Sequence, residues 1–405
     1  MKKIYFDHAA TTHLDSKVLE KMLPYLKTKY GNASSLHNYG QESKDAIEKA
    51  RKELANILKC SSEEIIFTSC GSESDSLAII GYALANKSKG NHIITSKFEH
   101  PAVLEACKFL ETQGFEISYI SITKQGLVDI EKLKKSITKK TILVSIMHAN
   151  NEIGTIQPIE EIYKICKDKS NEYKTKIVFH TDAVQTFGKI EINSSMADMI
   201  SISAHKFYGP KGIGLLYKKS GINIKPIIHG HQEKNLRGGT YNTASIVGMA
   251  EAAKIAQKEK DVINKKLKNL TEKLTNEVLK IENTWINGIG KGAGENKLPG
   301  LVNFGFLLIE GESILMHLDN KGIMCSTGSA CSSDSLQASH VLLALGLKPE
   351  EAHGSLRISL GKENTEEDID YFLSVLPEIV EKLRNMSPFK NKAQLKSFKG
   401  NSTCR

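Results

Sequence analysis

The spacing of short apolar segments along the chain is the feature that most restricts its fold. Six such segments alternate with amphipathic helical patterns, at residues 65–67, 93–94, 117–120, 142–146, 177–179 and 199–202. Strands that return to one sheet through helices pair in parallel, and the helices then cover both faces of the sheet. The sequence therefore predicts an α/β fold built on a mostly parallel sheet.

Patterns outside this alternation predict a second, smaller α/β domain. After a long helical pattern at about 243–280, strands are expected at 301–306 and 355–360, and helices at 312–320, 335–345 and 365–386. The N-terminus, with a strand expected at 3–6, is predicted to join this smaller domain. Helices at about 15–29 and 39–59, separated by a loop at 31–37, belong to the large one. The predicted division is 15–260 for the large domain, 1–14 and 261–386 for the small domain, and 387–405 for a basic flexible tail.

Composition and charge are those of an ordinary globular protein. The 405 residues are 25% charged, with a formal net charge of +9. Five basic residues lie in the last sixteen positions, which contain no acid, so the first 389 residues carry only +4. Lysines that alternate with glutamates on helices are typical of a solvated face, and no direct contact with nucleic acid is expected.

Neither a membrane segment nor a cysteine-bound metal is expected. The polar residues Asp7 and His8 come before any apolar segment of signal-peptide length, and no later apolar run would span a bilayer. The seven cysteines are odd in number and include no CxxC pair, so the sequence indicates neither a disulfide framework nor a zinc site. A cytoplasmic protein is predicted.

One lysine stands where the last of the six strands runs into a glycine-rich turn. Lys206 follows the apolar alternation of 199–202 and precedes two aromatic residues, so its stem is expected to be enclosed. A desolvated lysine loses its proton more easily, as a Schiff-base lysine must. Ser203 and His205 would project on one face of the strand, where they could hold an anion. The alternative is a lysine at a strand end whose amino group reaches solvent.

Two other strand ends carry polar candidates. Gly71 and Ser72 begin a helix whose N–H groups could bind a phosphate, although Ser72 could instead only cap that helix. Asp182 follows the strand at 177–179 at the carboxyl edge of the sheet, where it could pair with a protonated pyridine nitrogen. The alternative for Asp182 is a helix cap. Gln185 would share its face if a helical turn begins there.

The C-terminal part adds a thiol and a guanidinium group. Cys331 lies among small residues in a loop expected at about 325–335, which suits a reactive thiol that must move. Cys325, which precedes this loop, is predicted to be structural. Arg357, in the strand at 355–360, has a planar fork that can bind a carboxylate through two hydrogen bonds.

At these motifs the chain resembles the class V aminotransferase-like enzymes that use pyridoxal phosphate (PLP), and most closely the cysteine desulfurases of the NifS/IscS type. The resemblance extends from Tyr5 to about Gly361, with the motifs in the family's order and at similar spacings. It implies PLP fold type I, with a sheet of the seven-stranded type. The residues expected to bind the cofactor are Gly71, Ser72, His100, Asn151, Asp182, Gln185, Ser203, His205, Lys206 and Thr240.

Some of these assignments rest on the resemblance. His100 would stack on the PLP ring and shuttle protons, and Asn151 would contact cofactor and substrate, whereas alone they would indicate a surface residue and a turn. Thr240 would reach the phosphate of the neighbouring subunit, which implies a homodimer. The chain departs from the family where His229 and His231 replace glycines, which leaves the behaviour of that loop open; the pair does not indicate a metal site.

The resemblance implies conversion of L-cysteine to L-alanine. Arg357 would bind the substrate carboxylate and Lys206 would remove the α-proton. Cys331 would take the sulfur as a persulfide and pass it to an acceptor protein for iron–sulfur cluster assembly or tRNA thiolation. A transient iron–sulfur cluster ligated by Cys331 is a further expectation.

Other functions remain open at this point. A selenocysteine lyase or a cysteine sulfinate desulfinase would share the scaffold and depend less on the thiol. A catalytically silent scaffold protein is a rival of another class, and the presence of Lys206, Asp182 and Cys331 argues against it. The sequence does not specify the acceptor, or any role for Cys404 in the basic tail.

Overall fold

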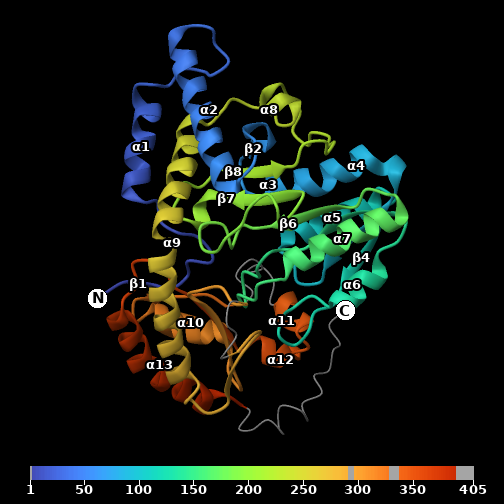
Figure 1. The fold of residues 1–405 in the computed structure, drawn as a ribbon. Helices are drawn as coiled ribbons and strands as arrows, with labels where there is room; N and C mark the ends of the chain where they lie inside the picture. Colours follow the sequence, from blue (N-terminus) through green and yellow to red (C-terminus); the bar gives the residue numbers. More distant parts are fainter. Residues whose placement is uncertain (1, 291–295, 328–336, 389–405) are drawn as a thin grey trace.

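The structure, a computed structural model, describes residues 2–290, 296–327 and 337–388. A seven-stranded sheet with the order β2-β8-β7-β6-β5-β3-β4 forms its centre (Figure 1). The strands are β2 (Ile65–Thr68), β3 (His92–Ser96), β4 (Glu116–Ile120), β5 (Thr141–Ser145), β6 (Val178–Asp182), β7 (Met199–Ser203) and β8 (Gly214–Lys218). Each of the six predicted apolar segments is one of these strands, which confirms the predicted mostly parallel sheet.

One strand of this sheet is missing from the prediction. β8 pairs antiparallel with both of its neighbours, β2 and β7. It follows β7 through a glycine-rich turn rather than a helix, so the alternation of strands and helices does not reveal it. Because β8 reverses direction between them, β2 runs parallel to β7, and six strand carboxyl ends point to the same edge of the sheet.

Helices cover both faces of the sheet, as predicted. Neighbouring residues of β5 point to opposite faces, so Leu143 packs in one apolar cluster and Val144 in another. The Leu143 side includes Val103 of α5 (Pro101–Thr112), and the Val144 side includes Leu54 of α2 (Asn38–Leu58) and Ile162 of α7 (Ile159–Tyr173). Full burial of each such side chain contributes about 1.5–3 kcal/mol.

A second group of strands has a core of its own. Its strands are β12 (Ser355–Ser359), β10 (Leu301–Phe306) and β9 (Thr284–Ile286), which form an antiparallel sheet, and β1 (Ile4–Tyr5) and β11 (Ile323–Met324), which pair in parallel. Phe6, Phe304 and Phe372 are fully buried in the shared cluster. The first residues of the chain therefore lie beside elements from its C-terminal part, as Figure 1 shows in blue and red.

Helix α9 (Thr243–Val278) connects the two groups of strands (Figure 1). Met249 near its start belongs to the core of the large sheet, whereas Leu274 near its end belongs to the second core. The predicted division at about residue 260 stays a prediction.

The remaining helices are α1 (Ser16–Lys27), α3 (Gly71–Ser76), α4 (Tyr82–Asn86), α6 (Ile130–Ser136), α8 (Gln232–Asn235), α10 (Gly311–Asp319), α11 (His340–Ala344), α12 (Pro349–Ala352) and α13 (Glu366–Met386).

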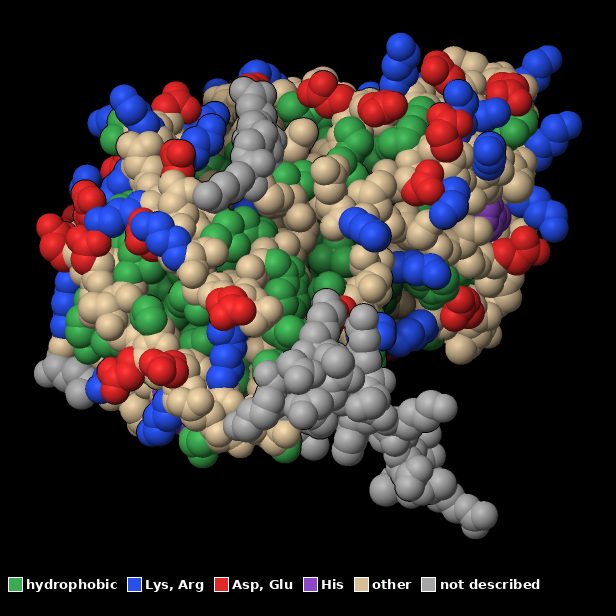
Figure 2. Space-filling model, turned by 90° about the horizontal axis from the view of Figure 1, so that it is seen from below, with side chains coloured by type: hydrophobic (Ala, Val, Ile, Leu, Met, Phe, Trp, Pro, Cys, Tyr) green, Lys and Arg blue, Asp and Glu red, His purple; other side chains and the backbone are tan. Residues whose placement is uncertain are grey.

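Acidic and basic side chains are interspersed over the face shown in Figure 2, with hydrophobic side chains between them. None of the helices in the described part of the chain combines the length and apolar character needed to traverse a bilayer.

Candidate active site

The carboxyl ends of the parallel strands surround a cavity of about 260 Å³. β6 ends at Asp182 and β7 ends at Ser203. Because these ends lie along one edge of the sheet, the loops that follow them come together. Ten predicted site residues line the cavity: Gly71, Ser72, His100, Asn151, Asp182, Gln185, Ser203, His205, Lys206 and Arg357.

Two predicted site residues are not among those that line this cavity. Thr240 is described and exposed, and it does not line this cavity. Cys331 lies outside the described residues, together with 328–335 of the loop predicted around it.

Lys206 closes a short turn (Ala204–Lys206) directly after β7. Its Nζ donates hydrogen bonds to the carbonyl oxygens of Ala9 and Ala10, both at 2.7 Å. The N-terminal segment therefore forms one wall of the cavity. His205 shares a hydrogen bond of 3.1 Å with Thr11 Oγ1, and burial, followed by the charge of Lys206, lowers the pKa of His205 to about 4. Its imidazole is thus neutral at physiological pH.

Two buried carboxyl groups line the same cavity. Asp182 Oδ1 accepts a hydrogen bond from Val184 N at 2.8 Å, yet burial raises the pKa of Asp182 to about 6. Burial and the nearby charge of Asp182 hold the pKa of Asp75 well above its ordinary value. Asp75 Oδ1 has no hydrogen-bond partner among the described residues. This pair therefore favours a ligand that brings a positive charge to Asp182.

The helix that begins at Gly71 presents its first turn to the cavity. Within the described residues, the N-cap Cys70 makes no side-chain hydrogen bond to the first N–H groups, so these groups are available to an anion. Ser72 is exposed beside them. A Cβ atom at Gly71 would lie 2.7 Å from Val184 Cγ2, so only glycine fits here without displacing the cavity wall.

His100 is held at the start of α5 by the backbone, because its Nδ1 accepts a hydrogen bond from Ala102 N at 3.1 Å. Burial, and then the charge of Lys206, lowers the pKa of His100 to about 4. The ring is therefore neutral and carries its proton on Nε2. A neutral imidazole at the cavity wall suits stacking on another aromatic ring.

Arg357 reaches the cavity from the second sheet. Its Nη2 pairs with Asp7 Oδ1 at 2.8 Å, and its Nη1 donates to the carbonyl oxygen of Asn151 at 3.1 Å. Within the described residues, the buried Nε of Arg357 has no hydrogen-bond partner. The guanidinium is thus fixed at the cavity with donor capacity left for an anionic ligand.

Three cysteines of the described residues are enclosed in the core. Cys107 and Cys166 are fully buried, whereas the partly buried Cys70 lines the cofactor cavity. Cys325 is also buried, and burial raises its pKa to about 12, so its thiol stays protonated at neutral pH.

A family model described as aminotransferase class-V matches residues 4–372. The chain belongs to the aminotransferase class-V family. Among curated relatives, it is similar to cysteine desulfurase IscS of Dictyoglomus turgidum, with 52% identity over 393 residues that cover 96% of this chain and 97% of the relative. Cysteine desulfurase IscS of Methanosarcina thermophila is 49% identical over 390 residues, which cover 96% and 94%.

Solved structures show the same class-V architecture. A NifS-like protein matches with a TM-score of 0.87 and 40% identity, covering 94% of this chain and 100% of that one. A structure described as SspA in complex with cysteine matches with a TM-score of 0.76 and 36% identity, covering 90% and 100%. These matches confirm the predicted PLP fold type I.

Aminotransferase class-V enzymes use PLP, and the residues of this cavity fit that cofactor. The helix start at Gly71 offers N–H groups to a phosphate, and the Asp182–Asp75 pair offers a negative site to a protonated ring nitrogen. Lys206 supplies the amine that the cofactor's aldehyde carbon requires. All three features line one cavity.

The sequence gives no sign of several contacts at the site. Asp7 lies 350 positions from its partner Arg357 in the sequence. Asp75 lies in helix α3, and the sequence does not indicate whether its side chain faces solvent or the protein interior. Asp7 does occur in the N-terminal motif that carries the resemblance, which places it near the site without giving it a partner. The contacts of Lys206 with the carbonyl oxygens could not be predicted either, because backbone atoms are the same in every residue type.

Proposed function

We propose that the protein is a PLP-dependent L-cysteine desulfurase, which converts L-cysteine to L-alanine and transfers the sulfur, as a Cys331 persulfide, to an acceptor. The observation that carries this proposal is the meeting of Lys206, Asp182 and Arg357 at one cavity, in a chain 52% identical to a cysteine desulfurase IscS over nearly its whole length. A cytoplasmic location is part of the proposal.

The chain's own residues would hold the cofactor and the substrate. When bound, PLP supplies an electron sink for the substrate's α-carbon. Lys206 would hold the cofactor and move a proton at the α-carbon, and its two carbonyl partners keep its amine at the cavity edge. Asp182 would keep the ring nitrogen protonated. Arg357 would orient the substrate through its carboxylate.

Sulfur transfer would require a thiolate, because only the thiolate is a good nucleophile. The Cys331 sulfur would attack the substrate sulfur and form an S–S bond. The electron pair of the broken C–S bond would stay with the substrate carbon, which takes up a proton to give alanine. The persulfide would then pass to an acceptor protein of iron–sulfur assembly or tRNA thiolation.

The flanks of the undescribed segment 328–336 support this assignment of Cys331. On one side, Ser326 pairs with Arg357 through two backbone hydrogen bonds of 2.7 and 3.3 Å. On the other side, Ser339 donates to Glu152 Oε2 at 2.6 Å. Both attachments adjoin cavity residues, since Glu152 follows Asn151.

The proposal is tested by comparing three substrates. We expect purified protein to be yellow with PLP and to release sulfide and alanine from L-cysteine in the presence of a thiol reductant. Selenocysteine and cysteine sulfinate should be turned over with lower kcat/KM. A colourless protein that gains no absorption band with PLP would contradict the proposal, and a preference for selenocysteine or the sulfinate would favour those activities instead.

Arg357→Lys tests the substrate carboxylate site. Lysine keeps the charge but loses the planar fork, so one charge-assisted hydrogen bond of about 1.5–3 kcal/mol is lost, which corresponds to an about 10–100-fold lower kcat/KM for cysteine, chiefly through KM. PLP absorption should stay unchanged. Arg384→Lys, at an arginine that bonds backbone carbonyls of Leu307 and Asn283, serves as control. Equal losses in both variants would refute a role in substrate binding.

A homodimer is also part of the proposal. Thr240 is exposed and does not line the cavity of its own chain, which fits a role in a partner's site. Apolar side chains of α1 and the segment after it are exposed as well, among them Leu26, Tyr30 and Leu36, the last at 94%. Such exposure is typical of an interaction surface.

Mixing an inactive variant with an impaired one tests whether Thr240 acts in the partner's site. We expect Thr240→Val to weaken PLP binding about tenfold by removing one hydroxyl bond to the phosphate. At subsaturating PLP, co-refolded Thr240→Val and Lys206→Ala chains should recover about a quarter of wild-type activity, because one site of each mixed dimer is intact. Light scattering would verify the dimer. If the mixture is no more active than its share of Thr240→Val chains alone, or a monomer is fully active, Thr240 does not act across an interface.

A further inference from the structure

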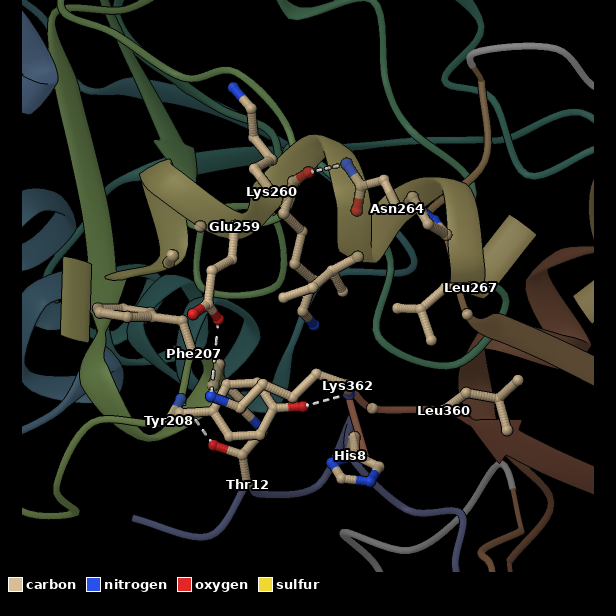
Figure 3. Close-up of a pocket in the computed structure, with 18 of the residues that line it drawn as sticks. His8, Thr12, Phe207, Tyr208, Glu259, Lys260, Asn264, Leu267, Leu360 and Lys362 are labelled. Carbon is tan, nitrogen blue, oxygen red and sulfur yellow. Dashed lines mark hydrogen bonds and ion pairs between the residues drawn. The ribbon is translucent and has the colours of Figure 1, made fainter. Parts of the chain in front are cut away.

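Lys189 is a partly buried lysine next to the candidate active site that the proposed mechanism does not use. It lines a second cavity of about 60 Å³, which shares Lys206 and Ala9 with the wall of the cofactor cavity. Figure 3 shows this second cavity between side chains of α9, such as Asn264, and residues near Tyr208. Its volume suits a few water molecules rather than a second ligand.

A chain of hydrogen bonds connects Lys189 to Lys206. Lys189 Nζ donates to Gln185 Oε1 at 3.4 Å, and Gln185 Nε2 donates to the carbonyl oxygen of Ala9 at 3.0 Å. Lys206 Nζ donates to the same Ala9 oxygen at 2.7 Å. Gln185 is therefore held at both ends of its amide, between the two lysines.

The chemistry of these partners favours one orientation of the Gln185 amide. A backbone carbonyl can only accept hydrogen bonds, and a lysine amine has N–H groups to donate whether it is charged or neutral. A reversed amide would point its oxygen at the Ala9 oxygen, which is repulsive, and would turn the acceptor of Lys189 away from it. Lys189 and the Ala9 carbonyl together thus hold the orientation in which Oε1 of Gln185 faces Lys189 and Nε2 faces Ala9, at the wall of the cofactor cavity that Gln185 lines.

The backbone of Lys189 is itself fixed. Its N–H donates to the carbonyl oxygen of Thr186 at 2.9 Å, and Asn264 Nδ2 of α9 donates to its carbonyl oxygen at 2.6 Å. Gln185 and Lys189 are four residues apart in one turn, so their side chains lie on the same side. The Lys189 amine is consequently held within reach of the Gln185 side-chain amide.

A lysine at this position works against stability. Burial, and then the positive charges of Lys206 and Arg357, lowers the pKa of Lys189 to about 7. In the unfolded chain the Lys189 amine keeps its ordinary, higher pKa and binds its proton more tightly. The free energy of unfolding therefore rises with pH between the folded-state pKa and the ordinary pKa. Below the folded-state pKa the protein bears the whole cost of enclosing a charged amine. A methionine would fill the same space without this penalty, which indicates that the amine has a function.

We propose that Lys189 is a positioning residue that fixes the Gln185 amide with its N–H donors toward the cofactor's phenolic oxygen. The inference rests on the proposed PLP-dependent function, since it takes Gln185 as one of the residues that bind PLP in the cavity it lines. A donor at this oxygen withdraws negative charge from the bound cofactor and lowers its affinity for a proton.

The test is the pH titration of the visible absorption band of bound PLP without substrate. In Lys189→Met the midpoint of this titration should rise by about one pH unit, because the N–H donor is no longer held at the cofactor. Gln185→Leu should give a similar rise. The double variant should show no further rise, since Lys189 acts through Gln185. Lys189→Arg, which keeps a donor, should restore the wild-type midpoint.

Lys297→Met is the matched control. Lys297 is a second partly buried lysine, and desolvation lowers its pKa to about 8, but it donates to the carbonyl oxygen of Ile289 and lines neither cavity. Its replacement should leave the midpoint unchanged. Thermal unfolding of the PLP-free proteins checks folding, and Lys189→Met should be at least as stable as wild type at pH 7, with a smaller advantage at pH 10.

Two failures can be told apart. A wild type that binds no PLP would overturn the proposed function. A wild type that binds PLP and titrates, with an unshifted midpoint in folded Lys189→Met, would overturn the role of Lys189 alone. Additive shifts in the double variant would also overturn it, because they would mean that Lys189 acts directly on the cofactor by its charge.

Discussion

Lys206→Ala is expected to lose turnover of L-cysteine by about four orders of magnitude or more, because in the proposed mechanism Lys206 both attaches PLP covalently and moves the α-proton. PLP should still bind, since the N–H groups at Gly71 and the carboxylate of Asp182 remain in the cavity. Sulfide release measures the first effect. Equilibrium dialysis of PLP and its absorption spectrum measure the second.

A matched control separates this effect from a general loss of charge. Lys225 is an exposed lysine after β8, and its side chain does not line either cavity. Lys225→Ala should keep wild-type activity. A Lys206→Ala variant that retains a tenth of the wild-type rate, or a PLP adduct found by mass spectrometry on another lysine, would disprove the assignment.

The position of this site could be predicted because it depends on strand order. Lys206, Asp182 and Gly71 each follow an apolar strand, and parallel strands bring their carboxyl ends to one edge whatever loops connect them. A local pattern in the sequence was thus enough to gather residues more than a hundred positions apart. The antiparallel strand β8 escaped prediction because no helix precedes it.

Pairs between distant segments could not be predicted. The buried pair of Arg51 with Glu233, which has two contacts of 2.8 Å, joins α2 to the segment around α8. Glu233 also accepts a hydrogen bond from Phe67 N at 2.9 Å and has a positive φ of 46°. In the sequence nothing distinguishes Glu233 from other acidic residues. It follows His229 and His231, in the loop where histidines replace glycines of the family. The structure shows that this loop is tied to β2 by an acid and not by either histidine, both of which are exposed.

Cys331→Ser is expected to bind PLP and to change its absorption spectrum when cysteine is added, yet to release essentially no sulfide. In the proposed mechanism the attachment of PLP and the removal of the α-proton depend on Lys206 and Asp182, which this substitution leaves unchanged. The loss concerns only the nucleophile, because a serine hydroxyl does not accept sulfur at neutral pH. Sulfide and alanine assays, together with stopped-flow absorption, measure the two halves of the reaction separately.

Cys325→Ser is the control for this variant. Cys325 is buried in the second core and its pKa is raised to about 12, so less than about one thiol in ten thousand is ionised at neutral pH. Its replacement should leave sulfide release near wild type, although a buried hydroxyl costs about 1–3 kcal/mol of stability. Loss of activity without loss of folding would assign the nucleophile to Cys325 instead.

Mass spectrometry of the wild type treated with cysteine, without a reductant, decides where the sulfur goes. One added sulfur should appear on the peptide that contains Cys331. Sulfur found only on Cys404 or Cys325 would refute the nucleophile while leaving the PLP chemistry intact. A selenocysteine-type enzyme gives a different pattern, because selenide is a better leaving group and departs without a protein nucleophile. In that case Cys331→Ser would still release selenium from selenocysteine at the wild-type rate, and the thiol would not be required for the physiological reaction.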